Sequence, residues 1–286
     1  MSVKMATIVG VNGGFGRMFA EKLRAEGWAV AGVDLAVTGT DLAEQVADFG
    51  ADGKMTLVSE NSSSTQADQW LSQSSLVCLC VPTKAALWWL DHAAGLLTAD
   101  SLCLDILSIK TEVTQRAAEA VFAGEYLSLH PMFAPRGDFS GLTMAVIPVK
   151  DGPHTADFIS MIKTWGCQVV SMNAEDHDQA SAVMQAGVHA ILLAMGRAAA
   201  RSGVPKETLA ALATPVSGPV SDLIKIITDG DPATYAAIQR ENPHARSVRE
   251  SLIEALDDLG RWSDLSDSAS FAEMVHEIRK GDGPKC

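Results

Sequence analysis

A glycine-rich turn near the amino terminus holds the first residues whose types and spacing could do chemistry. Gly10, Gly13 and Gly16 form a GxxGxxG pattern that joins an apolar run to a segment of helical period. Such glycines let the backbone turn tightly and approach a pyrophosphate, which then lies at the positive amino end of the helix. We predict that the turn binds a dinucleotide, with a ligand-free turn as the alternative. The residues expected to contact the cofactor here are Gly10, Asn12, Gly13, Gly14, Phe15 and Gly16.

An acidic residue, Asp34, ends the next apolar run, residues 28–34. Its carboxylate can accept hydrogen bonds from the adenosine ribose and would repel a 2′-phosphate, which favours NAD over NADP. The alternative is that Asp34 only caps the following segment. We favour cofactor binding because strand, turn, helix and acid occur in the order that a dinucleotide fold requires. A later run ends at three residues that we expect to line the nicotinamide half of the site, Val81, Pro82 and Thr83.

Four further segments combine polar residues in ways that could bind or transform a small molecule. Residues 105–110 read DILSIK, and residues 129–135 read LHPMFAP. Residues 175–189 read EDHDQASAVMQAGVH and begin a helical segment, on which Gln185 and His189 share a face because they lie four residues apart. Residues 231–243 read DPATYAAIQRENP. The face with Gln185 and His189 is also typical of a polar stripe at a helix or subunit interface.

Together with the glycine turn, these segments resemble the prephenate dehydrogenase family, and the resemblance spans nearly the whole chain. It implies hydride transfer from a cyclohexadienol ring to NAD with loss of the ring carboxylate, which leaves an aromatic phenol. This chemistry requires a base for the ring hydroxyl proton and cations for the two carboxylates of a cyclohexadienyl dicarboxylate. The resemblance also implies a homodimer formed through a helical domain.

His130 is the candidate base, because imidazole titrates near neutral pH and can take the hydroxyl proton as hydride leaves. The alternative is a packed histidine bonded to a main-chain carbonyl. Ser108 could hydrogen-bond the same hydroxyl or hold His130, or it could be a helix N-cap. Lys110 could attract the dianionic substrate or anchor the following helix. Gln185 and His189 could point together toward the substrate.

One departure from the family pattern concerns the ring carboxylate. Relatives carry an arginine five residues before the aspartate of the DP dipeptide, and Ile226 occupies that position here. Lys225 is adjacent and could replace the arginine, as a point charge rather than a bidentate fork. A different ring substituent is a further alternative. The other cations that could take this role are Arg240, Arg246 and Arg249.

Arg136 is the second departure. Family members that use arogenate tend to carry an acid near this position to pair with the substrate's ammonium group, which an arginine would repel. A guanidinium suits the pyruvyl carboxylate of prephenate, so Arg136 favours prephenate over arogenate. The alternative is a solvated arginine paired with Asp138. The segments HPMFAP, TWGCQVV and QRENP also resemble relatives that act on 4-amino-4-deoxyprephenate, so this amino analogue is the second candidate substrate.

Two other classes of protein share parts of this pattern. A redox-sensing regulator could bind the dinucleotide without turning it over, but it would not need Ser108 and His130 at strand ends. A β-hydroxyacid dehydrogenase or imine reductase would want a catalytic lysine on the long helix after the sheet, and residues 174–200 contain none. We therefore expect an oxidoreductase of the first kind.

The order of apolar and helical segments predicts the elements that position these residues. Apolar runs alternate with helical segments up to about residue 172, which is typical of a Rossmann-type, doubly wound and mostly parallel α/β sheet. Later segments read as alanine-rich helices, so we place an NAD-binding domain at 1–172 and a smaller all-helical substrate-binding and dimerisation domain at 173–286. The expected strands are 5–10, 28–34, 55–58, 76–81, 102–107, 126–130, 144–149 and 167–170, and the expected helices of the second domain are 175–201, 206–212, 216–228, 232–240 and 246–262.

Composition limits the remaining possibilities. The 286 residues are 47% hydrophobic, which suffices for a core, and a net charge of −13 disfavours nucleic acid and anionic membranes as partners. The apolar runs fall short of the about 18 to 20 residues of a membrane span, and no signal peptide is apparent, so we expect a cytoplasmic protein. We expect reduced cysteines and no metal site, because no CxxC, HExxH or zinc-like Cys/His spacing occurs.

Overall fold

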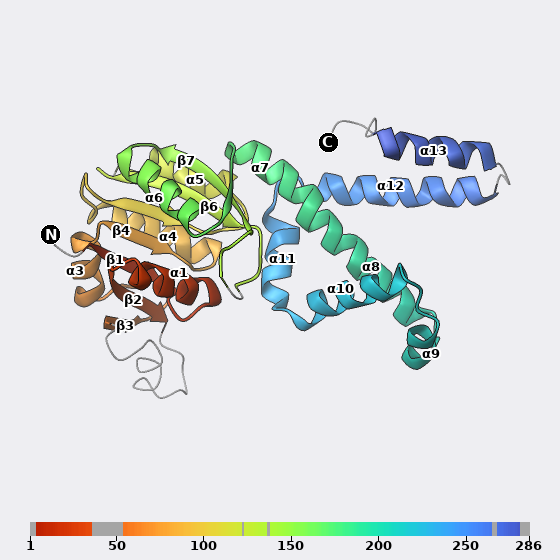
Figure 1. Ribbon diagram of the computed structural model, residues 1–286, viewed down its shortest axis with the longest axis horizontal. Helices are drawn as coiled ribbons and strands as arrows, with labels where there is room; N and C mark the ends of the chain where they lie inside the picture. The colour runs from red at the N-terminus through yellow and green to blue at the C-terminus, as the bar shows by residue number, and fades with distance from the viewer. Residues whose placement is uncertain (1–3, 36–53, 122, 136–137, 265–267, 281–286) are drawn as a thin grey trace. The chain divides into compact units, whose positions relative to one another are not determined.

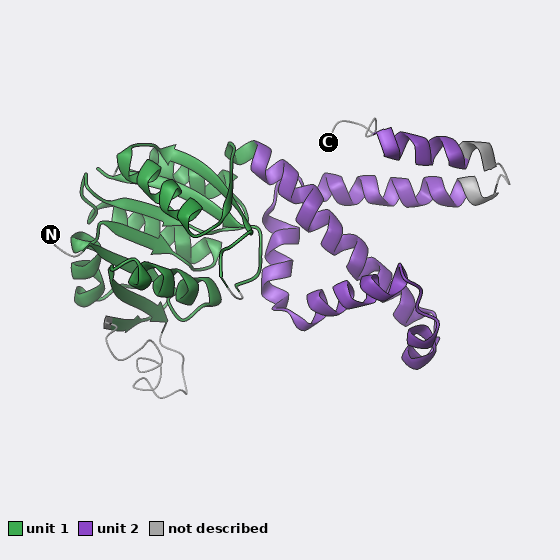
Figure 2. Cartoon of the chain, in the orientation of Figure 1, with its two compact units in different colours: residues 1–175 green, residues 176–286 purple. Residues whose placement is uncertain are grey.

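The computed structural model describes residues 4–35, 54–121, 123–135, 138–264 and 268–280. It divides into two compact units, Met1–Glu175 and Asp176–Cys286 (Figure 2). The division falls close to the boundary that the sequence pattern predicts near residue 172. The first unit is an α/β sheet with helices on both faces, and the second unit is helical (Figure 1).

The first unit is built on one eight-stranded sheet with the order β3-β2-β1-β4-β5-β6-β7-β8. The strands β1 to β6 are parallel to one another, whereas β7 is antiparallel to β6 and pairs in parallel with β8. The predicted mostly parallel sheet is confirmed, and each expected strand overlaps an observed one. The strands are β1 (Met5–Val9), β2 (Ala29–Leu35), β3 (Lys54–Val58), β4 (Leu76–Leu79), β5 (Leu102–Asp105), β6 (Glu125–Pro131), β7 (Thr143–Lys150) and β8 (Gln168–Ser171).

The central strands are apolar throughout because alternate residues enter two different cores. On one face, Ile8, Cys78 and Leu104 pack with α1 (Gly14–Ala25) and α6 (Pro153–Thr164). On the other face, Val77 and Leu79 pack with three helices, α3 (Thr65–Gln73), α4 (Thr83–Ala94) and α5 (Thr111–Glu119). Figure 1 shows these helices on the two sides of the sheet. This doubly wound arrangement keeps the carboxyl ends of β1, β4, β5 and β6 along one edge.

One long helix starts at the end of the first unit and continues into the second; it is formed by α7 (Ala174–Ser181), the π-helix η1 (Ala182–Gly187) and α8 (Val188–Arg201). Asp231 caps α11 (Pro232–Glu241) by accepting the main-chain N–H groups of Ala233 and Thr234, as expected for an aspartate before a proline at the first helical position. The five expected helices of this unit are present. The further helices are α9 (Lys206–Ala211), α10 (Ser217–Asp229), α11 (Pro232–Glu241), α12 (Ala245–Asp264) and α13 (Ser268–Lys280), the last of which the sequence pattern did not predict.

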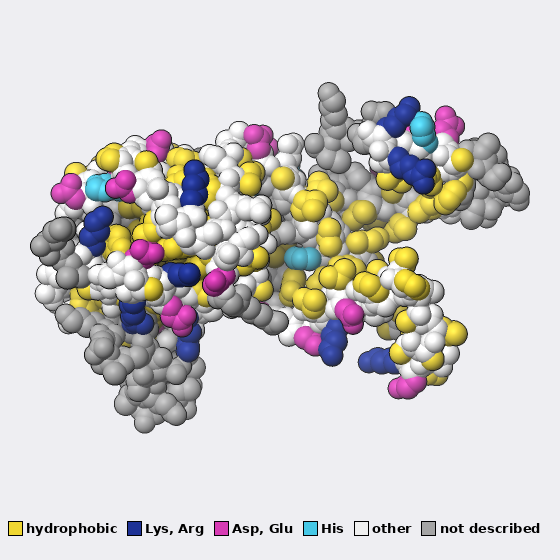
Figure 3. All heavy atoms as spheres, in the orientation of Figure 1, with side chains coloured by type: hydrophobic (Ala, Val, Ile, Leu, Met, Phe, Trp, Pro, Cys, Tyr) yellow, Lys and Arg dark blue, Asp and Glu magenta, His cyan; other side chains and the backbone are white. Residues whose placement is uncertain are grey.

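The long helix Ala174–Arg201 is apolar enough, at a mean hydropathy of 1.3 over 18 residues, to span a membrane by length and composition alone. No shorter described helix meets that test. One such helix is weak support for a membrane protein, because an exposed apolar face is also typical of a surface that binds another protein. Its exposed apolar side chains include Met184, Val188, Ile191 and Met195. Figure 3 shows hydrophobic side chains gathered on the helical unit.

Candidate functional site

The glycine turn between β1 and α1 is shaped by close contacts between main-chain atoms. Gly10 has a φ of +83°, and a Cβ added there would lie 2.3 Å from the carbonyl oxygen of Cys80. A Cβ on Gly16 would lie 2.1 Å from the carbonyl oxygen of Gly10. Gly13 and Gly14 are exposed at the amino end of α1. A pyrophosphate fits this turn, because side-chain-free backbone meets a helix amino terminus there.

The predicted ribose-binding acid is joined to this turn. The Asp34 carboxylate is half-buried at the end of β2, and its Oδ2 accepts the main-chain N–H of Asn12 at 2.7 Å. Its Oδ1 accepts the N–H of Leu35 at 2.8 Å. The Asn12 Oδ1 atom is buried without a hydrogen-bond partner among the described residues. Asp34 and the glycine turn are therefore joined by a hydrogen bond. The segment that Asp34 could cap lies outside the described residues.

The segment after β4 lies against the same turn. Cys80 donates its N–H to the carbonyl of Val9 at 2.8 Å, and Val81 Cγ1 lies 2.7 Å from the position of a Cβ on Gly10. Pro82 is the N-cap of α4, which begins at Thr83. The structure thus places Val81, one of the predicted nicotinamide-side residues, beside Gly10 of the predicted pyrophosphate-side turn.

His130 is the penultimate residue of β6, where it pairs with Ala145 of β7, and it is 3% exposed. The segment that follows it returns to the glycine turn. Phe133 contacts Phe15 edge to face, with ring centroids 5.8 Å apart. The Pro135 Cγ lies 2.5 Å from where a Cβ on Gly14 would be. The candidate base and the candidate cofactor turn are therefore parts of one neighbourhood in the first unit.

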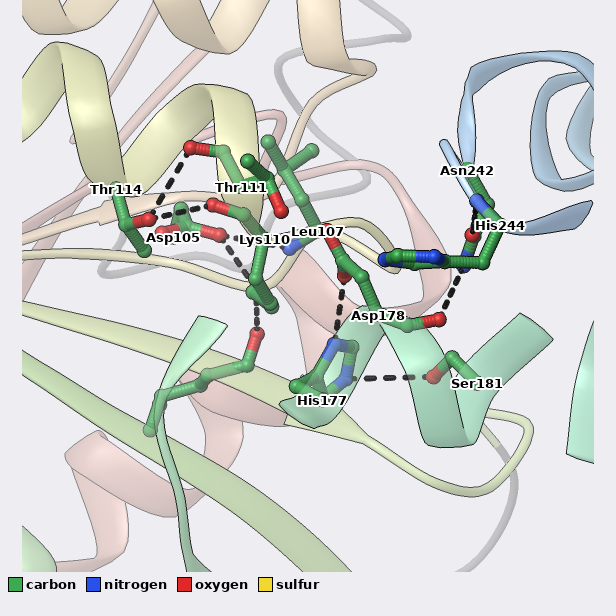
Figure 4. Close-up of polar contacts among 11 residues, drawn as sticks. Asp105, Leu107, Lys110, Thr111, Thr114, His177, Asp178, Ser181, Asn242 and His244 are labelled. Carbon is green, nitrogen blue, oxygen red and sulfur yellow. Dashed lines mark hydrogen bonds and ion pairs between the residues drawn. The ribbon is translucent and has the colours of Figure 1, made fainter. Parts of the chain in front are cut away.

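Lys110 is enclosed in the first unit, with both it and Asp105 0% exposed (Figure 4). Its ammonium donates to Asp105 Oδ1 at 2.8 Å and to the carbonyl of Leu129 at 2.5 Å. Asp105 Oδ2 accepts the Tyr126 hydroxyl at 2.9 Å, and burial together with this carboxylate raises the pKa of Tyr126. The predicted contact of Lys110 with the substrate is wrong for this structure, because the ammonium is fully enclosed by these partners.

Ser108 is half-buried on the segment between β5 and α5. The N-cap residue of α5 is Lys110, two positions later, so the alternative role of Ser108 as an N-cap is wrong. Ser108 stays a candidate for contact with the substrate or with His130.

A second polar cluster lies in the helical unit, and the sequence pattern did not predict its contacts (Figure 4). His177 Nδ1 lies 2.8 Å from Asp178 Oδ1, and His177 Nε2 lies 3.5 Å from Ser181 Oγ. Asn242 donates from Nδ2 to the Asp178 carbonyl at 2.9 Å and accepts the N–H of His244. Ser181, His177 and Asp178 share the residue types of a hydrolase triad, but all three are at most 3% exposed on one helix. The cluster joins the long helix to the segment between α11 and α12.

Gln185 lies inside the π-helix and His189 two residues beyond its end. The His189 ring contacts Tyr235 edge to face at 4.9 Å, and its Nδ1 is buried without a partner among the described residues. Burial lowers the pKa of His189 below its ordinary value, so the imidazole is neutral at pH 7. Lys225 is exposed on α10, and none of the described hydrogen bonds or ion pairs joins its ammonium to these residues.

The other candidate cations have partners of their own. Arg240 pairs with Glu241 at 3.0 Å, and Arg246 pairs with Glu250 at 2.8 Å, both on exposed surface. Arg249 donates to Gln239. Arg136 lies outside the described residues, so neither its predicted contact with the substrate nor its pairing with Asp138 can be located.

The described residues include no group of three or more His, Cys, Asp or Glu that could hold a metal. Four cysteines are free thiols, and burial raises the pKa of Cys167 to about 11. Cys286 lies outside the described residues. The four described cysteines are Cys78, Cys80, Cys103 and Cys167.

Comparison with known proteins places these features in context. Residues 19–148 match the family model described as "Prephenate dehydrogenase, nucleotide-binding domain", and residues 173–277 match "Prephenate dehydrogenase, dimerization domain". The 4-amino-4-deoxyprephenate dehydrogenase of Streptomyces pristinaespiralis is 31% identical over 273 residues, covering 95% of this chain and 89% of that protein.

Two further relatives are more distant. The probable arogenate/prephenate dehydrogenase of Methanocaldococcus jannaschii is 24% identical, and the match covers 97% of this chain but 60% of that protein. The crystal structure of prephenate dehydrogenase from A. aeolicus in complex with hydroxyphenyl propionate and NAD+ superimposes with a TM-score of 0.71 at 18% identity, covering 99% of both chains. At that identity the superposition shows a shared fold.

Proposed function

The chain belongs to the prephenate dehydrogenase family and is an oxidoreductase of that type, and we propose that it catalyses the NAD-dependent oxidative decarboxylation of prephenate to 4-hydroxyphenylpyruvate. The observation that carries this proposal is the packing of the segment after His130 onto the glycine turn, through Phe133 on Phe15 and Pro135 on Gly14. This packing supports the proposal because the reaction requires a base near the hydride acceptor, and both candidate groups lie in the first unit.

The nucleotide-binding residues present fit NAD. The turn from Gly10 to Gly16 offers unshielded backbone to the pyrophosphate, and Asp34 offers a carboxylate to the adenosine ribose. Bound NAD would supply the hydride acceptor. Val81, Pro82 and Thr83 would line the nicotinamide half, because they follow β4 and Val81 lies beside the turn.

His130 would move the proton in this reaction. As hydride leaves the ring carbon, the imidazole takes the proton of the hydroxyl on that carbon. The bond to the ring carboxylate then breaks, carbon dioxide departs, and the electron pair completes the aromatic ring. The proton returns to the phenolic oxygen, so no net proton is consumed. Ser108 would hydrogen-bond the same hydroxyl.

The two carboxylates of the substrate need hydrogen-bond donors or cations, and the candidates are the residues that the sequence predicts for this role. In the helical unit, the neutral His189 imidazole and the Gln185 amide can hydrogen-bond a carboxylate. Lys225 would supply a positive charge in place of the arginine replaced by Ile226. In the first unit, Arg136 would pair with the pyruvyl carboxylate.

The second candidate substrate is 4-amino-4-deoxyprephenate, which bears an amine in place of the ring hydroxyl. It is favoured by the 31% identity to the Streptomyces pristinaespiralis enzyme over most of both chains. Prephenate remains the first candidate, because an imidazole is a natural acceptor for a hydroxyl proton.

The helical unit supports a further part of the proposal, a homodimer. Its family model is described as a dimerisation domain, and its exposed apolar side chains would be covered by a second copy. Light scattering at micromolar concentration tests this directly, and a monomer would contradict it.

The experiment that tests the function is NADH formation by the purified protein with NAD and prephenate, with arogenate and the amino analogue in parallel. Turnover of prephenate supports the proposal, and turnover of the amino analogue alone supports the second candidate. We expect His130→Asn to lower kcat by about 100- to 10,000-fold while NAD still binds. His154→Asn, on α6 of the same unit, is the matched control and should retain activity. NAD binding without turnover of any of the three would favour the redox-sensing alternative.

A further inference from the structure

The long helix of the second unit contains a wide turn at the residues proposed to bind substrate. In a π-helix each main-chain bond spans five residues rather than four, and such turns inside α-helices are frequently found at functional sites. The turn η1 ends at Gly187, where a Cβ would lie 2.9 Å from Val248 Cγ1 of α12. A side chain at this position would therefore require the Val248 side chain to shift. The wide turn and α12 are in close contact at Gly187.

A side chain from α11 holds the wide turn. Gln239 donates from Nε2 to the carbonyl oxygen of Ala186, inside the turn, at 2.6 Å. Arg249 donates from one nitrogen to both the Oε1 atom and the main-chain oxygen of Gln239, at 3.0 and 2.9 Å. A guanidinium only donates, so Oε1 must face Arg249 and Nε2 must face Ala186. The hydrogen bond from the Arg249 guanidinium thus fixes the orientation of the Gln239 amide.

The bonded carbonyl lies between the two residues proposed to contact the substrate. Ala186 directly follows Gln185 and precedes His189 by three positions. Tyr235, one helical turn before Gln239 on α11, packs edge-on against the His189 ring. One face of α11 therefore supports both the backbone of the wide turn and the ring of His189.

The end of α11 fixes the long helix at a second carbonyl. Asn242 donates to the Asp178 carbonyl at 2.9 Å, eight residues before Ala186. The two side-chain amides of the QRENP segment thus bind two main-chain carbonyls on one helix. These two hydrogen bonds resist sliding or rotation of the long helix relative to α11.

We propose that Gln239 is a positioning residue, which sets the place of Gln185 and His189 for the dicarboxylate substrate without touching it. The proposal rests on the substrate-binding role given to these two residues under the proposed function. If the Ala186 carbonyl loses its donor, the wide turn relaxes and the donors to the substrate carboxylate move. The cofactor residues lie in the other unit and should be unaffected.

The test compares steady-state kinetics of the full-length wild type and Gln239→Met, which keeps the side-chain length but removes the donor. We expect KM for prephenate to rise about tenfold, the effect of one lost hydrogen bond, with kcat changed less than about twofold. NAD affinity, measured by fluorescence titration, should be unchanged. Gln115→Met, an exposed glutamine on α5, is the matched control and should leave KM unchanged.

A second variant separates positioning from loss of stability. Gln239→Glu keeps a strong partner for Arg249 and so holds the α11 segment, but it has no donor for the Ala186 carbonyl. We expect the same rise in KM with a melting temperature close to that of the wild type. In the double variant with His189→Asn, KM should rise by clearly less than the product of the two single rises, because part of the effect of Gln239 passes through His189.

The outcomes distinguish this proposal from the proposed function. An active wild type whose KM is unchanged in both Gln239 variants overturns the positioning role alone. Effects of Gln239→Met and His189→Asn that multiply also overturn it, because the two residues would then act independently. A wild type that turns over none of the three substrates overturns the proposed function, and the positioning proposal with it.

Discussion

Replacing Lys110 by methionine tests whether the enclosed ion pair is structural. Methionine has a similar length and fits the enclosed space, but it leaves Asp105 without its cation. The carboxylate would retain the Tyr126 hydroxyl and the Leu107 N–H as partners. The Leu129 carbonyl, which precedes His130, would lose its donor.

The expected loss of stability follows from the burial of both charges. Breaking a buried ion pair by removing one partner costs about 3 to 5 kcal/mol, because the remaining charge stays unsolvated. Both side chains are 0% exposed, so solvent screening does not reduce this figure. In a unit of this size each kcal/mol shifts the melting temperature by about 2 to 4 °C, so Lys110→Met should melt about 6 to 20 °C lower.

A double-mutant cycle isolates the pair. Asp105→Asn together with Lys110→Met removes both charges and should recover at least about 2 kcal/mol relative to Lys110→Met alone. Urea unfolding followed by tryptophan fluorescence measures each variant, since Trp70 and Trp89 lie in the core of the first unit.

Two results would refute this reasoning. A cost below about 1 kcal/mol for Lys110→Met would mean that the ammonium is not enclosed as the structure shows. A normally stable Lys110→Met variant with a greatly raised KM for prephenate would restore the substrate contact that the sequence pattern predicts.

Other residues give shorter tests. Asp34→Arg removes the acceptor for the turn N–H and should weaken NAD binding at least about tenfold, as measured by fluorescence titration; unchanged affinity would contradict the ribose contact. Gly16→Ala places a Cβ 2.1 Å from a main-chain oxygen, so calorimetry should detect no nucleotide binding. Burial raises the pKa of the Glu125 carboxyl, but the hydrogen bonds that this carboxyl accepts from N–H groups of α6 lower the pKa by more. The contribution of Glu125 to stability is therefore complete above the unfolded pKa of about 4.3 and is lost as pH falls through the folded pKa. As pH falls through this range, the melting temperature of Glu125→Gln should therefore decrease less steeply than that of the wild type. Met195→Glu puts a charge on the exposed face of α8, so the molar mass measured by light scattering should decrease toward that of the monomer. An unchanged dimer mass would place the interface elsewhere.

The elements of the sheet could be predicted because each is a short apolar run bounded by turn residues. The direction of β7 could not, since an apolar run has the same pattern whichever way its strand lies. The helix α13 was missed because its apolar positions are sparse and follow a serine- and aspartate-rich segment. The π-helix was missed for another reason, namely that periodicity reveals an apolar face but not the spacing of main-chain bonds.

The glycine turn and Asp34 could be predicted because their chemistry is local and ordered along the chain. The role of Lys110 could not, because its enclosure depends on Leu129, nineteen residues later. Gln239 likewise reaches a carbonyl fifty-three residues earlier, at Ala186. Spacing within a motif predicts which residue types gather at a strand end, whereas the partners that enclose them come from the assembled fold.

Because β7 runs antiparallel to β6, these two strands pair after closing a connection of eleven residues, 132–142. The parallel strands β4 and β5 must close twenty-two residues, 80–101, through a crossover helix. Chain entropy favours the shorter closure by about 0.6 kcal/mol, and contacts of low sequence separation form fastest. We therefore expect β6 and β7 to form early in folding, so that the strand bearing His130 acquires its register before the nucleotide turn is assembled beside it.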